Sequence, residues 1–266
     1  MGGVSELQIL GLGAFAGLTI LLGMPIARAK GFSDTGRVGL SALAAGILMF
    51  LFYDVLKNAH ELVLAPFSGS PSNGPLTVEY SAVLIAGFAG SMAALLAFEM
   101  LWLGRMDSAK TESQGIDPLD LSTMIAVGIG LHNFAEGLAI GTAFAAGLSL
   151  ALVLVIGFAI HNATEGFGIL GPGMLAGSRY SVRRLLALGL VGGGPTFFGT
   201  AVGSFVSSDA VSILFYGLAA GAILYVVLQM ARPMLARPYR PVATAAIAIG
   251  FALGFVTDLV VTFGGA

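Results

Sequence analysis

The sequence predicts an all-α membrane protein with eight transmembrane helices. Of its 266 residues, 57% are hydrophobic and only 10% are charged, whereas a soluble domain carries roughly 25% charged residues. Eight apolar stretches reach the length of about 20 residues that a single span needs. These stretches are continuously apolar and about twice as long as the strands of a membrane barrel, so a β-barrel is excluded.

The first stretch is interpreted as a span and not as a signal peptide. A signal peptide has positive charge before its apolar region, but here the early charge is Glu6, and Arg28 and Lys30 come afterwards. The remaining spans are separated by short connections, except for two longer segments rich in turn-forming residues, 59–79 and 104–119. The spans that we expect, within a single transmembrane domain over residues 1–266, cover residues 7–27, 38–58, 80–103, 120–145, 149–170, 183–206, 210–230 and 241–262.

The positive charges predict the orientation of the chain. Eleven of the twelve Lys and Arg residues fall in the connections after the first, third, fifth and seventh spans, and Lys57 alone lies on the other side. Positively charged connections stay in the cytoplasm. Both termini are therefore expected outside, in a multi-pass protein of the plasma membrane, or of the inner membrane in a bacterium.

Charge and cysteine content exclude other functions. The net charge of -2 lacks the basic surface that a nucleic-acid partner requires. The chain has no cysteine, so disulfides, thiolate metal ligands and cysteine nucleophiles are excluded. We expect the lipid bilayer and a small ion as partners.

Two near-identical hexapeptides carry the chemistry. The fourth span contains His132-Asn133-Phe134-Ala135-Glu136-Gly137, and the fifth contains His161-Asn162-Ala163-Thr164-Glu165-Gly166. Residues four apart share one face of a helix, so each histidine points with its glutamate, while each asparagine is turned by about 100°.

The hairpin between these spans sets their register. His132 and His161 lie at similar separations from the turn near Gly147, and a helix rises about 1.5 Å per residue. The two imidazoles are therefore expected at one depth near the membrane midplane. Glu136 is then expected one turn towards the outside and Glu165 one turn towards the cytoplasm.

Imidazole and carboxylate together favour zinc and other first-row divalent ions. A carboxylate at the bilayer centre costs about 3 kcal/mol even on lenient scales, so two of them in one hairpin favour a bound cation. The alternative is that these residues hold helices together through hydrogen bonds. The duplication of the whole set favours the metal.

The two hexapeptides resemble the signatures on the fourth and fifth helices of the ZIP (ZRT/IRT-like) metal transporters, and the predicted topology is similar over the whole chain. The resemblance implies that His132, Glu136, His161 and Glu165 form a principal metal site. It also implies that Asn133, Asn162 and Glu165 belong to a neighbouring second site. A homodimer and a transport bundle of helices 1, 4, 5 and 6 that moves against helices 2, 3, 7 and 8 are implied as well.

The sequence departs from this pattern in two places. The motif proline is replaced by Ala135 and Thr164. Many relatives carry an acidic residue just before a proline of helix 6, whereas this chain has Gly192-Gly193-Gly194-Pro195. We therefore expect one strong site and a weak or lost second one. The glycine run predicts either a flexible or broken helix or close helix packing.

Other polar residues are less specific. Asp54, His60 and Glu61 are interpreted as an ordinary solvated loop in preference to a funnel for cations. Glu99 is expected to pair with Arg105. Asp258 fits either the end of a helix or an outer vestibule.

The sequence thus predicts a carrier that moves divalent metal into the cytoplasm by an elevator-like movement, with zinc as the expected ion. Cadmium, iron(II), manganese and cobalt fit the same ligands. The metal is cargo, and no cofactor and no enzymatic activity are expected. The alternative is an intramembrane metal-dependent hydrolase, but the compact His-Glu-x-x-His arrangement is missing.

Overall fold

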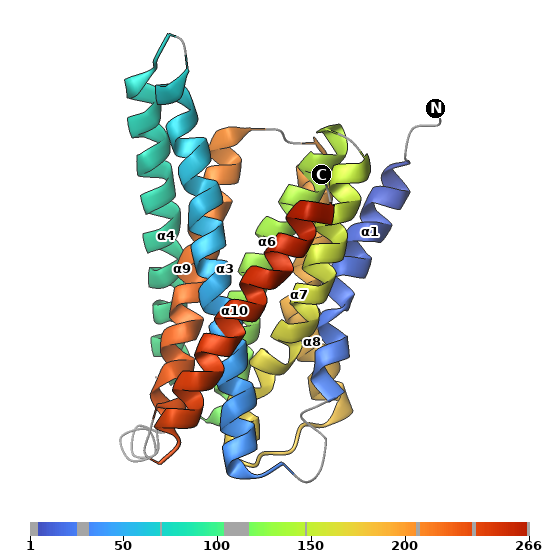
Figure 1. Cartoon of the computed structure of the whole chain (residues 1–266), viewed down its shortest axis with the longest axis vertical. Coiled ribbons are helices and arrows are strands. Elements are labelled where there is room, and N and C mark those ends of the chain that lie inside the picture. Colours follow the sequence, from blue (N-terminus) through green and yellow to red (C-terminus); the bar gives the residue numbers. More distant parts are fainter. Residues whose placement is uncertain are drawn as a thin grey trace.

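The computed structural model describes residues 5–25, 32–69, 71–103, 117–146, 148–205, 208–235 and 238–264, and over these residues the secondary structure is helical with no strand. Figure 1 shows long helices running side by side along the long axis of the molecule. Eight of its helical segments are long and apolar enough to cross a membrane. The prediction of an all-α fold with eight spans is confirmed.

The helix bounds follow the predicted spans with extensions at several ends. The first span is divided at Thr19, whose hydroxyl donates to the carbonyl of Ala16 at 2.6 Å. The helices are α1 (Glu6–Leu18), α2 (Ile20–Gly23), α3 (Asp34–Ser68), α4 (Gly74–Leu103), α6 (Pro118–Ala146), α7 (Leu148–Leu175), α8 (Val182–Phe205), α9 (Asp209–Met234) and α10 (Arg240–Gly264).

The expected loop over residues 59–79 is mostly helical, which corrects the sequence interpretation. α3 continues for ten residues beyond the predicted end of its span, and α4 begins six residues before the predicted start of its own. The turn-forming residues that suggested a loop are concentrated from Ser68 to Pro75, where α3 ends and α4 begins, and Pro66 lies inside α3. Most of the other long connection, 104–116, lies outside the described residues.

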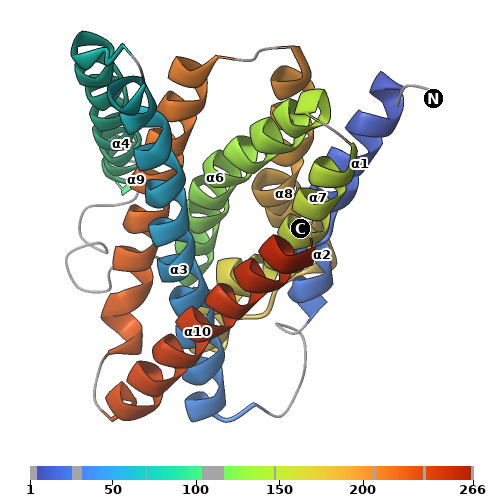
Figure 2. The same cartoon turned by 45° about the horizontal axis from the view of Figure 1, so that its top comes forward.

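α6 is the most enclosed helix of the fold, whereas α4 and α10 expose most of their surface. In Figure 2, α6 runs through the middle of the view, with α3 and α9 to its left and α1, α7 and α8 to its right. Because α6 is surrounded, its polar residues are removed from solvent and from lipid. This arrangement places both hexapeptides in the interior.

α8 packs closely against its neighbours and is continuous through its glycine run and Pro195. A side chain at Gly193 would overlap the backbone of Gly17 on α1, and a side chain at Gly137 would overlap the backbone of Thr196 on α8. Of the two predictions for this run, the structure therefore supports close packing and not a broken helix.

The turn between α7 and α8 is tied to the bundle by Tyr180. Its hydroxyl lies 2.7 Å from Ser122 Oγ on α6 and donates to the carbonyl of Leu170 on α7 at 3.1 Å. Burial raises the pKa of this phenol, so it stays protonated near neutral pH. The three helices are thereby joined at one end of the molecule.

Candidate metal site

The two hexapeptides meet in the interior between α6 and α7. The His, Asn and Glu residues of both hexapeptides are at least nine-tenths buried, and Asn133 and Asn162 are fully enclosed. The imidazole rings of His132 and His161 have centroids 6.4 Å apart. This separation is consistent with the expectation that the hairpin brings the two histidines to a similar depth.

The carboxylates converge on His132 more closely than a stack along the membrane normal implies. Nε2 of His132 lies 3.2 Å from Glu136 Oε1 on the same helix and 3.8 Å from Glu165 Oε1 on α7. One ligand atom from each of His132, His161 and Glu165 lies within 4.8 Å of the other two. Such a cluster has the donors and the dimensions for one metal ion bound by nitrogen and oxygen.

Most polar atoms of this cluster form no hydrogen bond among the described residues, although His132 Nε2 lies within ion-pair distance of both carboxylates. They include both oxygens of Glu136 and of Glu165, both ring nitrogens of His132 and Nε2 of His161. Buried polar groups are nearly always paired in folded proteins, and an unpaired charge is the most costly of all. So many unpaired donor atoms in one place indicate a ligand that pairs with them.

The asparagines are fixed by the neighbouring helices. Nδ2 of Asn133 donates to the carbonyl of Gly192 on α8, and Nδ2 of Asn162 donates to the carbonyl of Ala16 on α1, each at 3.0 Å. Their carbonyl oxygens remain unpaired and buried. The i, i+4 spacing predicts the pairing of His with Glu, but the partners of the asparagines depend on helix packing, which the sequence does not reveal.

The glycine run of α8, Gly192 to Gly194, supplies no acidic side chain beside the asparagines. The glycine run of α8 lies beside Asn133 through the backbone of Gly192, and a glycine offers a metal only its carbonyl. That carbonyl already accepts the amide of Asn133.

Asp54 lies closer to the site than its sequence position suggested. It lies within α3 and is partly buried, and its electrostatic neighbours include His132 and Asp258. The interpretation as a solvated loop is therefore wrong for Asp54, whereas His60 and Glu61 are exposed. The missed signal is Asn58, four residues later, whose amide donates to Asp54 Oδ2 at 3.2 Å.

Glu99 lies outside the site. Its Oε2 accepts from the hydroxyl of Tyr225 at 2.7 Å and from Nε2 of Gln229 at 2.9 Å, both on α9. Arg105, the partner expected from the sequence, lies outside the described residues. Tyr225 and Gln229 thus give Glu99 a structural role, and its pairing with Arg105 stays a prediction.

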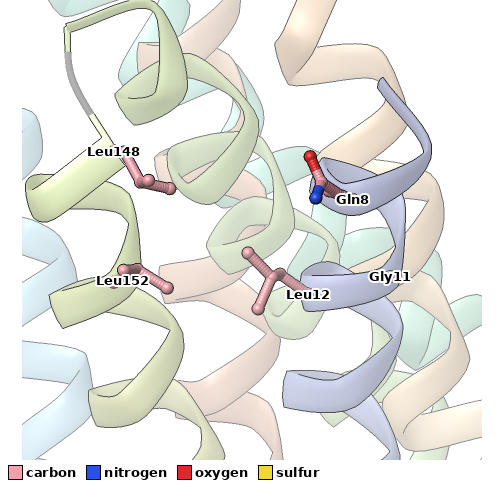
Figure 3. Close-up of a pocket in the computed structure, with 5 residues that line it drawn as sticks. All are labelled: Gln8, Gly11, Leu12, Leu148 and Leu152. Atoms are coloured by element: carbon pink, nitrogen blue, oxygen red, sulfur yellow. The ribbon is translucent and has the colours of Figure 1, made fainter. Parts of the chain in front are cut away.

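A pocket of about 420 Å³ lies between α1 and α7, away from the hexapeptides. Figure 3 shows Leu12 and Gln8 of α1 facing Leu148 and Leu152 of α7 across it. Its lining is mostly apolar and offers no histidine or carboxylate. The pocket therefore does not extend the metal cluster.

The sequence matches one family model and several known proteins. The model of the family described as "ZIP Zinc transporter" matches residues 105–261, which include both hexapeptides. Human zinc transporter ZIP5 is 36% identical over 148 residues, 54% of this chain and 27% of that protein. Human zinc transporter ZIP6 is 33% identical over 110 residues, and mouse zinc transporter ZIP10 is 30% identical over 111 residues. The chain spans about a quarter or less of the length of these relatives.

Proposed function

Because this chain belongs to the ZIP zinc transporter family, we propose that it carries divalent metal ions, zinc first among them, through the site formed by its two hexapeptides. The resemblance of the motifs and the distribution of positive charge support movement into the cytoplasm across the plasma membrane. His132, Glu136, His161 and Glu165 are the proposed principal ligands, and the side-chain oxygens of Asn133 and Asn162 are proposed as weaker neighbours.

The observation that carries this proposal is the buried cluster of unpaired donors. Ligand atoms of His132, His161 and Glu165 lie within 4.8 Å of one another, and both glutamates lack hydrogen-bond partners among the described residues. In the membrane interior a carboxylate is costly unless a cation or a donor accompanies it. A divalent ion offsets both carboxylates at once.

The ligand types favour a carrier over a storage site. The chain has no cysteine, so thiolates, which bind zinc in closed structural sites, are absent. Imidazole and carboxylate also suit iron(II), manganese, cobalt and cadmium. We therefore propose zinc as the main cargo, with these ions as competitors.

We place the movement between two groups of helices. α1, α6, α7 and α8 are linked at the site through Asn133 and Asn162, which supports a bundle that moves as a unit against α3, α4, α9 and α10. This alternating access requires no chemical reaction. The hydrolase alternative has no support from the relatives, which are named as transporters, and no enzymatic activity is proposed.

Zinc flux into proteoliposomes tests the proposal. We expect flux in the unaltered protein and a loss of about tenfold or more in His132→Ala and Glu165→Gln, since each removes a direct ligand. Glu99→Gln is the matched control, because it neutralises a carboxylate of a membrane helix that is held by Tyr225 and Gln229. Full flux in both site variants would refute the site, and no flux in the unaltered protein would refute the function.

A further inference from the structure

The side-chain hydrogen bonds between helices divide the molecule into two groups. Within the first, which we name the motif group (α1, α2, α6, α7 and α8), Asn133 bonds to α8, Asn162 bonds to α1, and Arg184 of α8 donates to the carbonyl of Leu119 of α6 at 2.8 Å. In the second, which we name the frame (α3, α4, α9 and α10), Glu99 joins α4 to α9. α10 also packs closely on α3: a side chain at Gly250 of α10 would overlap the backbone carbonyl of Leu43 on α3.

Apart from Asp54, which faces His132 and Glu136 from the frame, the contact between the two groups is formed mainly by apolar and small residues. The rings of Phe134 on α6 and Phe215 on α9 have centroids 4.7 Å apart. Gly168 of α7 packs against Ala44 of α3, and Gly171 packs against Ser41, whose buried hydroxyl has no partner among the described residues. Apolar contacts without fixed hydrogen bonds lack directional constraints, so this interface permits one group to move along the other.

One side-chain hydrogen bond crosses this interface in the described part of the chain. Nη1 of Arg37, near the start of α3, donates to the carbonyl of Met174 at 3.3 Å. Met174 lies in the last turn of α7, where its carbonyl also accepts the backbone N–H of Gly177 at 3.1 Å and carries the negative end of the helix dipole. A cationic side chain at this position stabilises the contact by charge as well as by hydrogen bonding.

The Arg37 end of α7 is separated from the metal cluster by an isoleucine layer, Ile20, Ile129 and Ile169. These three side chains surround Gly192, and all are fully buried. Ile169 lies one turn beyond Glu165, towards Met174. An ion that leaves the cluster in this direction must pass the layer.

We propose that Arg37 is a latch that holds the motif group against the frame in the position in which the isoleucine layer is shielded from solvent. This inference rests on the proposed transport by relative movement of the two groups. The latch opens when α7 moves along α3, because the carbonyl of Met174 then leaves the reach of Arg37. Arg37 binds no ion in this scheme and shifts only the balance between the held position and the moved one.

The absence of native cysteine makes the latch directly measurable. In an Ile169→Cys reporter, a water-soluble maleimide reacts only when the motif group has moved along the frame and brought the isoleucine layer to solvent. A partly exposed charged contact shifts an equilibrium by roughly two- to fivefold, so Arg37→Gln is expected to raise the labelling rate by about that factor. Arg37→Lys, which keeps the charge, is expected to lie between Arg37→Gln and the unaltered reporter.

Arg183→Gln is the matched control, because it removes an exposed arginine near the same end of the molecule that has no hydrogen bond or ion pair among the described residues. Its labelling rate is expected to equal that of the unaltered reporter, and zinc affinity is expected to be unchanged in all three arginine variants. Equal labelling of Arg37→Gln and Arg183→Gln would overturn the latch. Weakened zinc binding in Arg37→Gln alone would also overturn it, since the residue would then act on the site.

A second variant decides the question if Arg37→Gln does not fold. A side chain at Gly171 would place its Cβ 3.3 Å from that of Ser41, close to the roughly 3.5–4.5 Å of a disulfide. Oxidation of Ser41→Cys/Gly171→Cys is expected to lock α7 to α3, to stop labelling of the Ile169→Cys reporter by a maleimide added afterwards, and to be reversed by reductant. Undiminished labelling of the oxidised protein would overturn the latch. Labelling is read without flux, so a failure of the proposed transport is seen separately, as absent zinc flux in the unaltered protein.

Discussion

At the scale of single residues, the metal site is defined by buried imidazole and carboxylate side chains, most of whose polar atoms form no hydrogen bond among the described residues. Glu136 and Glu165 present four carboxylate oxygens that form no hydrogen bond among the described residues, beside His132 and His161. Replacing either glutamate by glutamine removes one charge and leaves the other ligands in place. The effect on metal binding therefore separates a ligand role from a packing role.

The stoichiometry of binding is the first prediction at this scale. We expect about one tightly bound zinc per chain, since Asn133, Asn162 and the glycine run provide no second acid beyond Glu165. Elemental analysis of the purified protein after zinc loading and desalting measures this ratio. A second ion retained as tightly as the first would show that the acid missing from α8 is not needed.

Asp54 gives a second prediction. It lies on α3 within electrostatic range of His132 and Glu136, so its carboxylate raises the local concentration of cations beside the site. We expect Asp54→Asn to raise the KM for zinc uptake by about three- to tenfold, while zinc flux at saturation changes little. The variant keeps a side-chain oxygen for Asn58.

The control for Asp54 is Glu79→Gln, an exposed carboxylate on α4, which is expected to leave uptake unchanged. An unaltered KM in Asp54→Asn, or an equal change in both variants, would contradict a role of Asp54 in attracting the ion.

At the scale of elements, α8 depends on glycine where it crosses its neighbours. Gly193 has no room for a side chain against Gly17, whereas a Cβ at Gly194 meets no atom within 4 Å. We expect Gly193→Ala to lower the thermal unfolding temperature in detergent, because overpacking costs about 1–3 kcal/mol. Gly194→Ala, the adjacent control, is expected to be tolerated. Equal unfolding temperatures would contradict the close contact of α1 with α8.

The elements also show how far sequence reasoning reaches. Eight apolar stretches predict eight spans because the bilayer thickness sets the length of a helix. Turn-forming residues hid the continuation of α3 to Ser68, because this helix contains Pro66 within its last turn. The contact of Gly193 with Gly17 joins residues far apart in the sequence, and local patterns carry no information about it.

For the site as well, the sequence predicted the local pairs of residues but not the contacts between distant helices. The spacing of His132 and Glu136, and of His161 and Glu165, follows from the periodicity of a helix. The proximity of Asp54 and the tie of Arg37 to Met174 depend on how α3 packs against the hairpin of α6 and α7. Such packing is a property of the assembled molecule.

At the scale of the whole molecule, orientation is the property to test. Eight spans return both termini to one side of the membrane, and the positive charges predict that this side is the outside. In the cysteine-free chain, Ser5→Cys is expected to react with an impermeant thiol reagent added to intact cells, and Arg183→Cys is expected to react only after permeabilisation. The reverse pattern would invert the direction proposed for transport.

The proposed homodimer belongs to this scale as well. α4 and α10 expose most of their apolar surface, which contacts lipid or a second copy of the chain. Native mass spectrometry from detergent is expected to give twice the 27.0 kDa mass of the chain. A monomer at all protein concentrations would contradict the dimer and leave the site within each chain intact.

The most direct test of the account is X-ray absorption at the zinc edge of the protein loaded with one equivalent of zinc. We predict a first shell of nitrogen and oxygen alone, with two imidazoles at about 2.0–2.1 Å supplied by His132 and His161. The His161→Ala variant is predicted to lose one imidazole and keep the oxygen ligands. A shell without imidazole, or one that His161→Ala leaves unchanged, would contradict the assignment of the two hexapeptides as the metal site.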